Sequence, residues 1–154
     1  MIPQMALDKR LETEIDENHQ PFVEPLVLIV DDHEPSQTVL RLIMQQFGFQ
    51  PMVVDTAEAA ISKLATSKNG FDILLMDYLL GEDDGLAVTA TLRAMADAAG
   101  KTAPMHTLLV TGAPEQVNKS GLSWDTANIA GVLPKPISAQ MLFDHLEPFH
   151  DHMK

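Results

Sequence analysis

Residues 71–85 read FDILLMDYLLGEDDG, and they decide how the rest of the chain is interpreted. The apolar run at the start of this stretch is short and continuous, which is typical of a central strand in a parallel sheet covered on both faces. The run ends on Asp77, and an acidic loop follows that closes at Gly85. A carboxylate at the end of such a strand is expected in the crevice where open α/β sheets bind ligands. Taken alone, Asp77 is more simply the start of a turn, so its role depends on the other strand ends.

Composition limits the classes of protein that the chain can belong to. Its 154 residues and 45% hydrophobic content suit one globular domain with a full core and a short appendage. With 10 basic and 22 acidic residues the formal net charge is −12, so we expect no nucleic-acid or membrane partner. The absence of cysteine excludes disulfides, thiol catalysis and thiolate metal sites. No segment has the apolar length of a signal peptide or a membrane span, and we therefore expect a cytoplasmic protein.

Two prolines divide the chain into a short leader and a body. Residues 1–24 are predicted to be an N-terminal extension, either disordered or forming a charged helix that packs on a partner or a second copy. Pro21 and Pro25 separate this extension from the body, because proline lacks a backbone donor and restricts the residue before it. The main domain is predicted to cover residues 25–150, followed by a tail at residues 151–154.

Strand and helix patterns alternate along the body. Such alternation predicts a parallel sheet with helices on both faces, because each right-handed crossover places its helix on one side of the sheet. We predict an α/β fold with a doubly wound, five-stranded parallel sheet of order 2-1-3-4-5, the flavodoxin-like (βα)5 arrangement. The predicted strands lie at about residues 26–30, 50–54, 71–76, 105–110 and 129–133. The predicted helices lie at about residues 35–47, 56–64, 86–98 and 137–150, and a further helix after Pro114 is left open.

Polar residues stand at the carboxyl ends of the predicted strands. Asp31 and Asp32 follow strand one and Asp77 ends strand three, so the predicted strand order brings these acids together at the reversal point. Carboxylates that close repel one another and raise a pKa unless a cation neutralises them. Oxygen ligands beside a loop match a hard ion such as Mg²⁺. Lys135 ends strand five and Thr111 ends strand four, and the lysine together with Mg²⁺ would balance the three negative charges.

These residues, in this order, resemble the receiver domain of two-component response regulators, which has the CheY-like fold. The resemblance covers the chain from about Pro25 to His150. It rests on the acidic pair Asp31-Asp32, on Asp77 with Gly85 eight residues later, on Thr111 followed by Gly112, and on Lys135-Pro136. Each element is weak alone, and the combination at successive strand ends is specific.

The resemblance implies a metal site. Asp77 would be the phosphoacceptor and would bind Mg²⁺ directly together with Asp32. Asp31 would bind the ion through water. The backbone carbonyl of Leu79 would complete the protein ligands of the metal.

The resemblance also implies a phosphoryl site and its partners. Lys135 and Thr111 would hold phosphoryl oxygens, and the Lys135-Pro136 bond is expected to be cis. The donor would be a phosphohistidine on a histidine kinase or a histidine phosphotransfer protein. Phosphorylation would alter the face built on the last two helices, which would bind a downstream protein partner. No separate turnover substrate is expected, so the chain would not be an enzyme in the usual sense.

Several positions depart from the receiver pattern. Receivers commonly carry an aromatic residue three positions before the lysine and a proline four positions after the phosphoacceptor, where this chain has Val132 and Gly81. Leu79 and Ala113 occupy the two positions that flank the approach of hydrolytic water in receivers, and neither can orient a water molecule. We therefore predict a long-lived phosphoryl group on Asp77.

A second function class is a metal-dependent phosphohydrolase with Asp77 as a transient nucleophile. Such enzymes typically need a general acid two residues after the nucleophile, and that position is Leu79. His145, His150 and His152 are predicted to be a solvated face and not a metal site. Trp124 is either a core residue or an exposed anchor, and both alternatives stay open.

Overall fold

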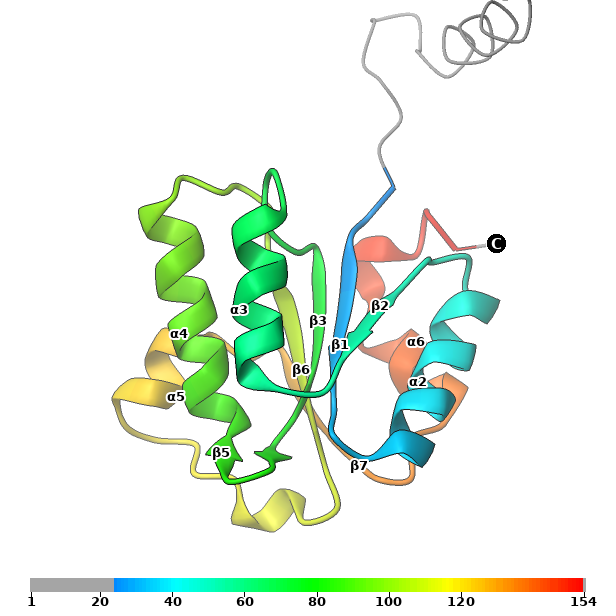
Figure 1. Cartoon of the computed structure of the whole chain (residues 1–154). Helices are drawn as coiled ribbons and strands as arrows, with labels where there is room; N and C mark the ends of the chain where they lie inside the picture. The colour runs from blue at the N-terminus through cyan, green and yellow to red at the C-terminus, as the bar shows by residue number, and fades with distance from the viewer. Residues whose placement is uncertain (1–23, 154) are drawn as a thin grey trace, which may run out of the picture.

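Five parallel strands form the central sheet of the computed structural model, which describes residues 24–153 (Figure 1). The sheet has the order β2-β1-β3-β6-β7, so its connections reverse direction between β1 and β3. This order confirms the predicted 2-1-3-4-5 arrangement, because β6 and β7 are the fourth and fifth strands of the main sheet. The strands are β1 (Val27–Val30), β2 (Met52–Val54), β3 (Ile73–Asp77), β6 (His106–Thr111) and β7 (Gly131–Pro134).

The two central strands bring the acidic residues to one edge of the sheet. Every residue of β1 and of β3 is buried, as expected of parallel strands that helices cover on both faces. Val30 pairs with Met76, and Asp77 pairs with Val110 on β6. The residues that follow β1 therefore lie beside the end of β3, at the carboxyl edge of the sheet.

Helices cover both faces of the sheet (Figure 1). The helices α2 and α6 lie on one face, and α3, α4 and α5 lie on the other. Each face has its own buried aliphatic cluster, with Leu40 and Leu142 in one and Leu64 and Leu92 in the other. Burial of each such leucine stabilises the fold by about 1.5–3 kcal/mol. The helices are α2 (Glu34–Gln46), α3 (Ala57–Thr66), α4 (Gly85–Ala98), α5 (Leu122–Ala127) and α6 (Ala139–Asp144).

Short side chains start three of the helices. The side chains of Thr56, Asp84 and Ser138 each accept a hydrogen bond from a backbone N–H in the first turn of α3, α4 and α6, respectively. Such caps satisfy amide groups that have no partner within the helix. Thr56 stands at the predicted start of the second helix.

The last predicted helix is shorter in the structure than the sequence suggested. The prediction of one helix over residues 137–150 is wrong, because α6 ends at Asp144 and the 3-10 helix η2 (Glu147–Phe149) follows it. Pro148 explains the break, since it has no N–H to donate to the preceding turn and its ring clashes with that turn. After Pro114 the chain forms the 3-10 helix η1 (Pro114–Gln116) and then the six-residue α5.

The two ends of the described chain lie at the same end of the sheet, where the parallel strands begin. β1 starts there, and the segment after α6 returns to it (Figure 1). The carboxyl ends of the strands, with Asp77, lie at the opposite edge. Apart from Glu24, the N-terminal extension predicted for residues 1–24 lies outside the described residues. Within residues 24–153, no helix combines the length and the apolar character that a membrane crossing requires.

Candidate functional site

Three aspartates meet at the carboxyl edge of the sheet. One carboxylate oxygen from each of Asp31, Asp32 and Asp77 lies within 4.8 Å of the others. Asp31 is fully buried and Asp77 is 6% exposed, whereas Asp32 faces solvent. The fold thus brings together acids that are 46 positions apart in the sequence, as the strand order predicted.

Lys135 is the cation of this cluster. Its Nζ lies 3.3 Å from Asp31 Oδ2 and 3.5 Å from Asp77 Oδ1, so it bridges the two buried acids. The Lys135 backbone N–H donates to the carbonyl of Thr111 over 2.8 Å, which holds the end of β7 beside the end of β6. The Lys135-Pro136 peptide bond is cis, as expected. One lysine against three carboxylates leaves the cluster with an excess of negative charge.

Asp31 has one satisfied and one unsatisfied oxygen. Its Oδ1 accepts a hydrogen bond of 2.8 Å from the backbone N–H of His33. Its Oδ2 is buried and, among the residues that the structure describes, has no hydrogen-bond partner, although Lys135 Nζ lies within ion-pair distance. Buried carboxylate oxygens normally accept a hydrogen bond, so this oxygen can still accept one from a water bound to a metal ion. Oxygen donors of this kind fit Mg²⁺, which usually keeps several of its waters.

The environment of Asp77 disfavours its charged form. Burial, the negative charge of Asp31 and, to a smaller extent, that of Asp32 together raise the pKa of Asp77 from its ordinary value of 3.8 to about 6, in spite of the lowering effect of Lys135. The carboxylate is still mostly ionised at neutral pH and can act as a nucleophile. A cation bound beside it would lower the pKa again, because it would stabilise the charged form.

Thr111 lies at the end of β6, one position beyond the residue that pairs with Asp77. Its side chain is buried, and its Oγ1 accepts a hydrogen bond of 3.0 Å from the backbone N–H of Ala113. The hydroxyl proton is still available for a further acceptor. Thr111 is therefore placed to connect the carboxyl edge of the sheet with the loop after β6.

The loop after Asp77 folds into a small hairpin. β4 (Leu79–Leu80) pairs with β5 (Asp83–Asp84) in antiparallel register, and the Leu79 side chain is 60% exposed. Gly85 then passes close to the end of β3, where an added Cβ would lie 2.1 Å from the backbone oxygen of Asp77. Only glycine allows this approach. Asp84 accepts a hydrogen bond of 2.8 Å from the N–H of Leu86, so it serves as a helix cap.

Two further residues contact the acidic pair and were not predicted from the sequence. The Gln37 side chain donates to the backbone carbonyl of Asp31 over 2.6 Å. The Gly81 N–H donates to Asp32 Oδ2 over 2.9 Å. In the sequence, the only notable feature of Gly81 is that it stands where receivers commonly have a proline. A contact between a backbone amide and a side chain 49 positions away leaves no periodic signal in the sequence.

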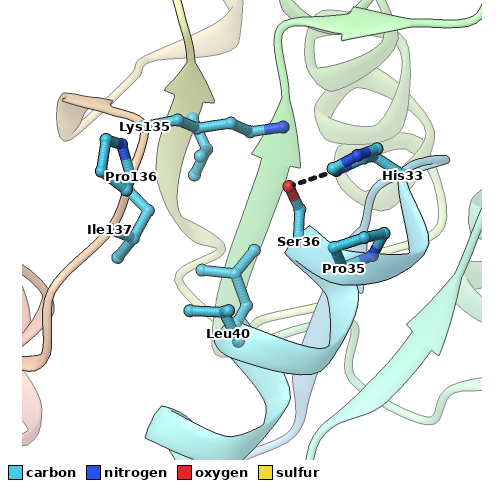
Figure 2. A pocket seen from close by; sticks show the side chains of 9 residues that line it. His33, Pro35, Ser36, Leu40, Lys135, Pro136 and Ile137 are labelled. Atoms are coloured by element: carbon cyan, nitrogen blue, oxygen red, sulfur yellow. Dashed lines mark hydrogen bonds between the residues drawn. The ribbon is translucent and has the colours of Figure 1, made fainter.

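A pocket of about 150 Å³ opens beside Lys135, between the start of α2 and the segment after β7 (Figure 2). Its lining is mostly apolar and includes Leu40 and Ile137. His33 lies at its rim, exposed at the start of α2, and its Nδ1 is 2.9 Å from Ser36 Oγ. This mostly apolar pocket therefore lies next to the acidic cluster, on the side of the cluster where α2 begins.

The C-terminal histidines contact backbone carbonyls and aromatic rings. A ring nitrogen of His145 lies 2.8 Å from the carbonyl of Met141. His150 stacks on Phe143, and His152 stacks on Phe49 at the end of the α2 segment. Of the two alternatives for Trp124, the structure supports packing, because this residue of α5 is partly buried against the core.

Comparison with known proteins assigns the chain to a family. The family model of the response regulator receiver domain matches residues 27–147. The chain is similar to the sensory/regulatory protein RpfC of Xanthomonas campestris pv. campestris, with 26% identity over 120 residues. It is also similar to probable histidine kinase 4 of Oryza sativa subsp. japonica, with 24% identity over 137 residues. These matches cover 78% and 80% of this chain, and 16% and 14% of the two relatives, respectively.

A solved structure has the same fold. It is the receiver domain of sensor histidine kinase PA1611 from Pseudomonas aeruginosa PAO1, described with a magnesium ion coordinated in its active site cleft. The TM-score is 0.66 at 21% identity, and the match covers 84% of this chain and 99% of that one. The family match spans the sheet with its helices and includes all the residues of the acidic cluster. The chain therefore belongs to the response regulator receiver domains of two-component systems.

Proposed function

We propose that this chain is a phosphoacceptor in a two-component phosphorelay and that Asp77 takes a phosphoryl group from a phosphohistidine donor. The observation that carries this proposal is the position of Asp77, which is almost buried, is flanked by two acids and lies 3.5 Å from Lys135 Nζ. Nucleophilic carboxylates form aspartyl phosphates in other phosphoryl-transfer systems. Such transfer requires positioning and counter-charge more than other groups from the protein.

The acidic cluster would hold Mg²⁺. Asp32 and Asp77 would bind the ion directly, Asp31 would bind it through water, and the backbone carbonyl of Leu79 would complete the protein ligands. The buried and unsatisfied Asp31 Oδ2 supports this assignment, as does the magnesium ion described for the PA1611 receiver domain. When bound, Mg²⁺ supplies positive charge for the carboxylates and for the phosphoryl oxygens.

The transfer forms one bond and breaks another. A carboxylate oxygen of Asp77 attacks the phosphorus atom, an O–P bond forms, and the P–N bond of the phosphohistidine breaks. The leaving imidazole nitrogen keeps the electron pair and takes a proton from solvent. Lys135 Nζ already contacts both buried acids, and we propose that it contacts a phosphoryl oxygen after transfer.

Thr111 would carry the change to the surface. A phosphoryl group adds about −1.5 to −2 charge and strong hydrogen-bond acceptors. The Thr111 hydroxyl can donate to one of these acceptors, and as it moves toward the phosphoryl group its bond from the Ala113 N–H would draw the backbone after β6 along. The loop that contains η1 would move with it and change the face formed by α5, β7 and α6. Val132 stands where receivers often have an aromatic residue, so the loop and not a turning ring would carry the signal.

The proposed donor is a histidine kinase or a histidine phosphotransfer protein. Similarity to RpfC and to a probable histidine kinase supports this class of partner. The proposed output is binding of a downstream protein partner, without a separate turnover substrate. The lack of nucleic-acid and membrane partners stays a prediction that rests on the net charge of −12, and cytoplasmic location stays a prediction that rests on the pattern of apolar residues in the sequence.

The proposal is tested by incubating the protein with acetyl phosphate and MgCl₂ and measuring its intact mass. Wild type should gain one phosphoryl group and Asp77→Asn should gain none, while the exposed control Asp151→Asn should be labelled like wild type. Absence of label on wild type, or label on Asp77→Asn, would contradict the proposal. Steady phosphate release from a generic phosphomonoester would instead support a phosphohydrolase. Against that function, this chain has Leu79 at the position where such enzymes carry a general acid.

A further inference from the structure

Asp32 is the least constrained of the three acids. Asp31 and Asp77 are buried, so packing fixes their side chains, whereas Asp32 is exposed. An exposed carboxylate next to two like charges is expected to turn toward water, because repulsion favours separation. The 2.9 Å hydrogen bond from the Gly81 N–H to Asp32 Oδ2 opposes that rotation.

The hairpin after Asp77 is built to present this amide. Leu79 pairs with Asp84 and Leu80 pairs with Asp83, so Gly81 and Glu82 form a two-residue loop. Gly81 has a φ of +61°, and Glu82 is not among the residues with positive φ, which is the pattern of a type II′ turn. The N–H of the first loop residue takes no part in the pairing of the two strands. It is therefore free to donate to a group outside the hairpin.

We propose that Gly81 is a positioning residue whose backbone N–H holds Asp32 beside Asp31 and Asp77 and so increases the affinity of the cluster for Mg²⁺. This inference rests on the proposed function, of which the Mg²⁺ site is a part. The proline common at this position in receivers has no N–H and cannot form this bond. The hairpin of this chain replaces that proline with a donor aimed at a metal ligand.

The expected effect follows from the general behaviour of groups that orient metal ligands. Loss of such a group typically weakens metal binding about 10- to 100-fold. Asp32 is one of several ligands and is exposed to solvent, so loss of the Gly81 donor should weaken Mg²⁺ binding about 10-fold, at the lower end of that range.

The test removes the N–H and leaves the side chain unchanged. Incorporation of glycolic acid at position 81 replaces the amide by an ester in the full chain. The matched control carries the ester one position later, with the hydroxy-acid analogue of glutamate at position 82, so it keeps both the Gly81 N–H and the glycine at φ +61°. The dissociation constant for MgCl₂ is measured by calorimetry on metal-free protein.

The protein with the ester at position 81 should bind Mg²⁺ about 10-fold more weakly than wild type, and the control with the ester at position 82 should stay within about 2-fold of wild type. Binding by the position-81 ester within about 2-fold of wild type, or binding by the position-82 control as weak as that of the position-81 ester, would overturn the proposal. Hydrogen exchange on the unmodified protein gives an independent measurement. The Gly81 amide should exchange at least about 10-fold more slowly than the Glu82 amide after correction for intrinsic rates, and equal rates would overturn the proposal.

Labelling of wild type by acetyl phosphate separates this inference from the proposed function. If wild type binds Mg²⁺ and is labelled but the position-81 ester binds Mg²⁺ equally well, only the role of Gly81 fails. If wild type is not labelled, the proposed function fails, while the calorimetry and the hydrogen exchange still report on the contact between Gly81 and Asp32.

Discussion

Replacement of Asp77 by asparagine should stabilise the metal-free protein at neutral pH. The native fold holds this carboxylate in an unfavourable environment, because burial and the charge of Asp31 raise its pKa from 3.8 to about 6 in spite of Lys135. Asparagine has nearly the same shape and no charge. The substitution therefore removes the cost of ionising a buried acid while it preserves the packing around residue 77.

The size and the pH dependence of this effect follow from proton linkage. The folded protein binds the Asp77 proton more tightly than the unfolded chain does, so wild type loses stability as the pH rises from 3.8 to about 6. One pKa unit corresponds to about 1.4 kcal/mol, so the shift of Asp77 corresponds to ~3 kcal/mol above pH 6. The difference between variant and wild type should fall below ~1 kcal/mol at pH 4.

The assay is urea unfolding in EDTA at pH 7.5 and at pH 4, with the same substitution at the exposed Asp151 as a control. We expect Asp77→Asn to gain about 3 kcal/mol at pH 7.5 and Asp151→Asn to change little at either pH. Added MgCl₂ should stabilise wild type more than Asp77→Asn, because the ion relieves the same repulsion. An Asp77→Asn protein no more stable than wild type at pH 7.5, or a gain equal at both pH values, would refute the reasoning.

Three further substitutions test other parts of the structure. Leu79→Asn should shorten the lifetime of the phosphoryl group on Asp77, because an amide can orient the attacking water, and an unchanged half-life by intact mass would contradict this. Gly85→Ala should lower the free energy of unfolding by at least ~2 kcal/mol, because the added Cβ would lie 2.1 Å from a backbone oxygen. The control Gly112→Ala, whose Cβ meets nothing within 4 Å, should cost clearly less in the same urea experiment. Arg93→Lys should cost about 2 kcal/mol in urea unfolding, since Arg93 donates to two backbone carbonyls at 2.7 Å, and a wild-type midpoint would contradict that role.

The sheet and the gathering of acids were predictable because they depend on local patterns. Residues buried on both faces of a parallel sheet form continuous aliphatic runs, so β1 and β3 are visible in the sequence. Strand order then brings Asp31, Asp32 and Asp77 to one edge. The end of α6 was also visible in principle, because Pro148 marks a place where a helix cannot continue.

Other features could not be predicted, because they depend on the arrangement of distant backbone atoms. The hydrogen bond from Gly81 to Asp32 requires both a particular turn and a particular separation of two loops. The need for glycine at position 85 appears only when the backbone of Asp77 is in place. The raised pKa of Asp77 likewise depends on burial and on Asp31, neither of which the sequence alone can quantify.

The common location of both ends of the described chain matters for any tether. Both ends of the described chain lie on the side of the sheet opposite the carboxyl end of β3, where Asp77 stands (Figure 1). A surface anchor attached at either end would leave the acidic cluster facing the solvent. Immobilisation through those ends would therefore suit binding measurements with a phosphohistidine protein, and the same geometry would let a longer polypeptide carry this unit without obstructing the donor.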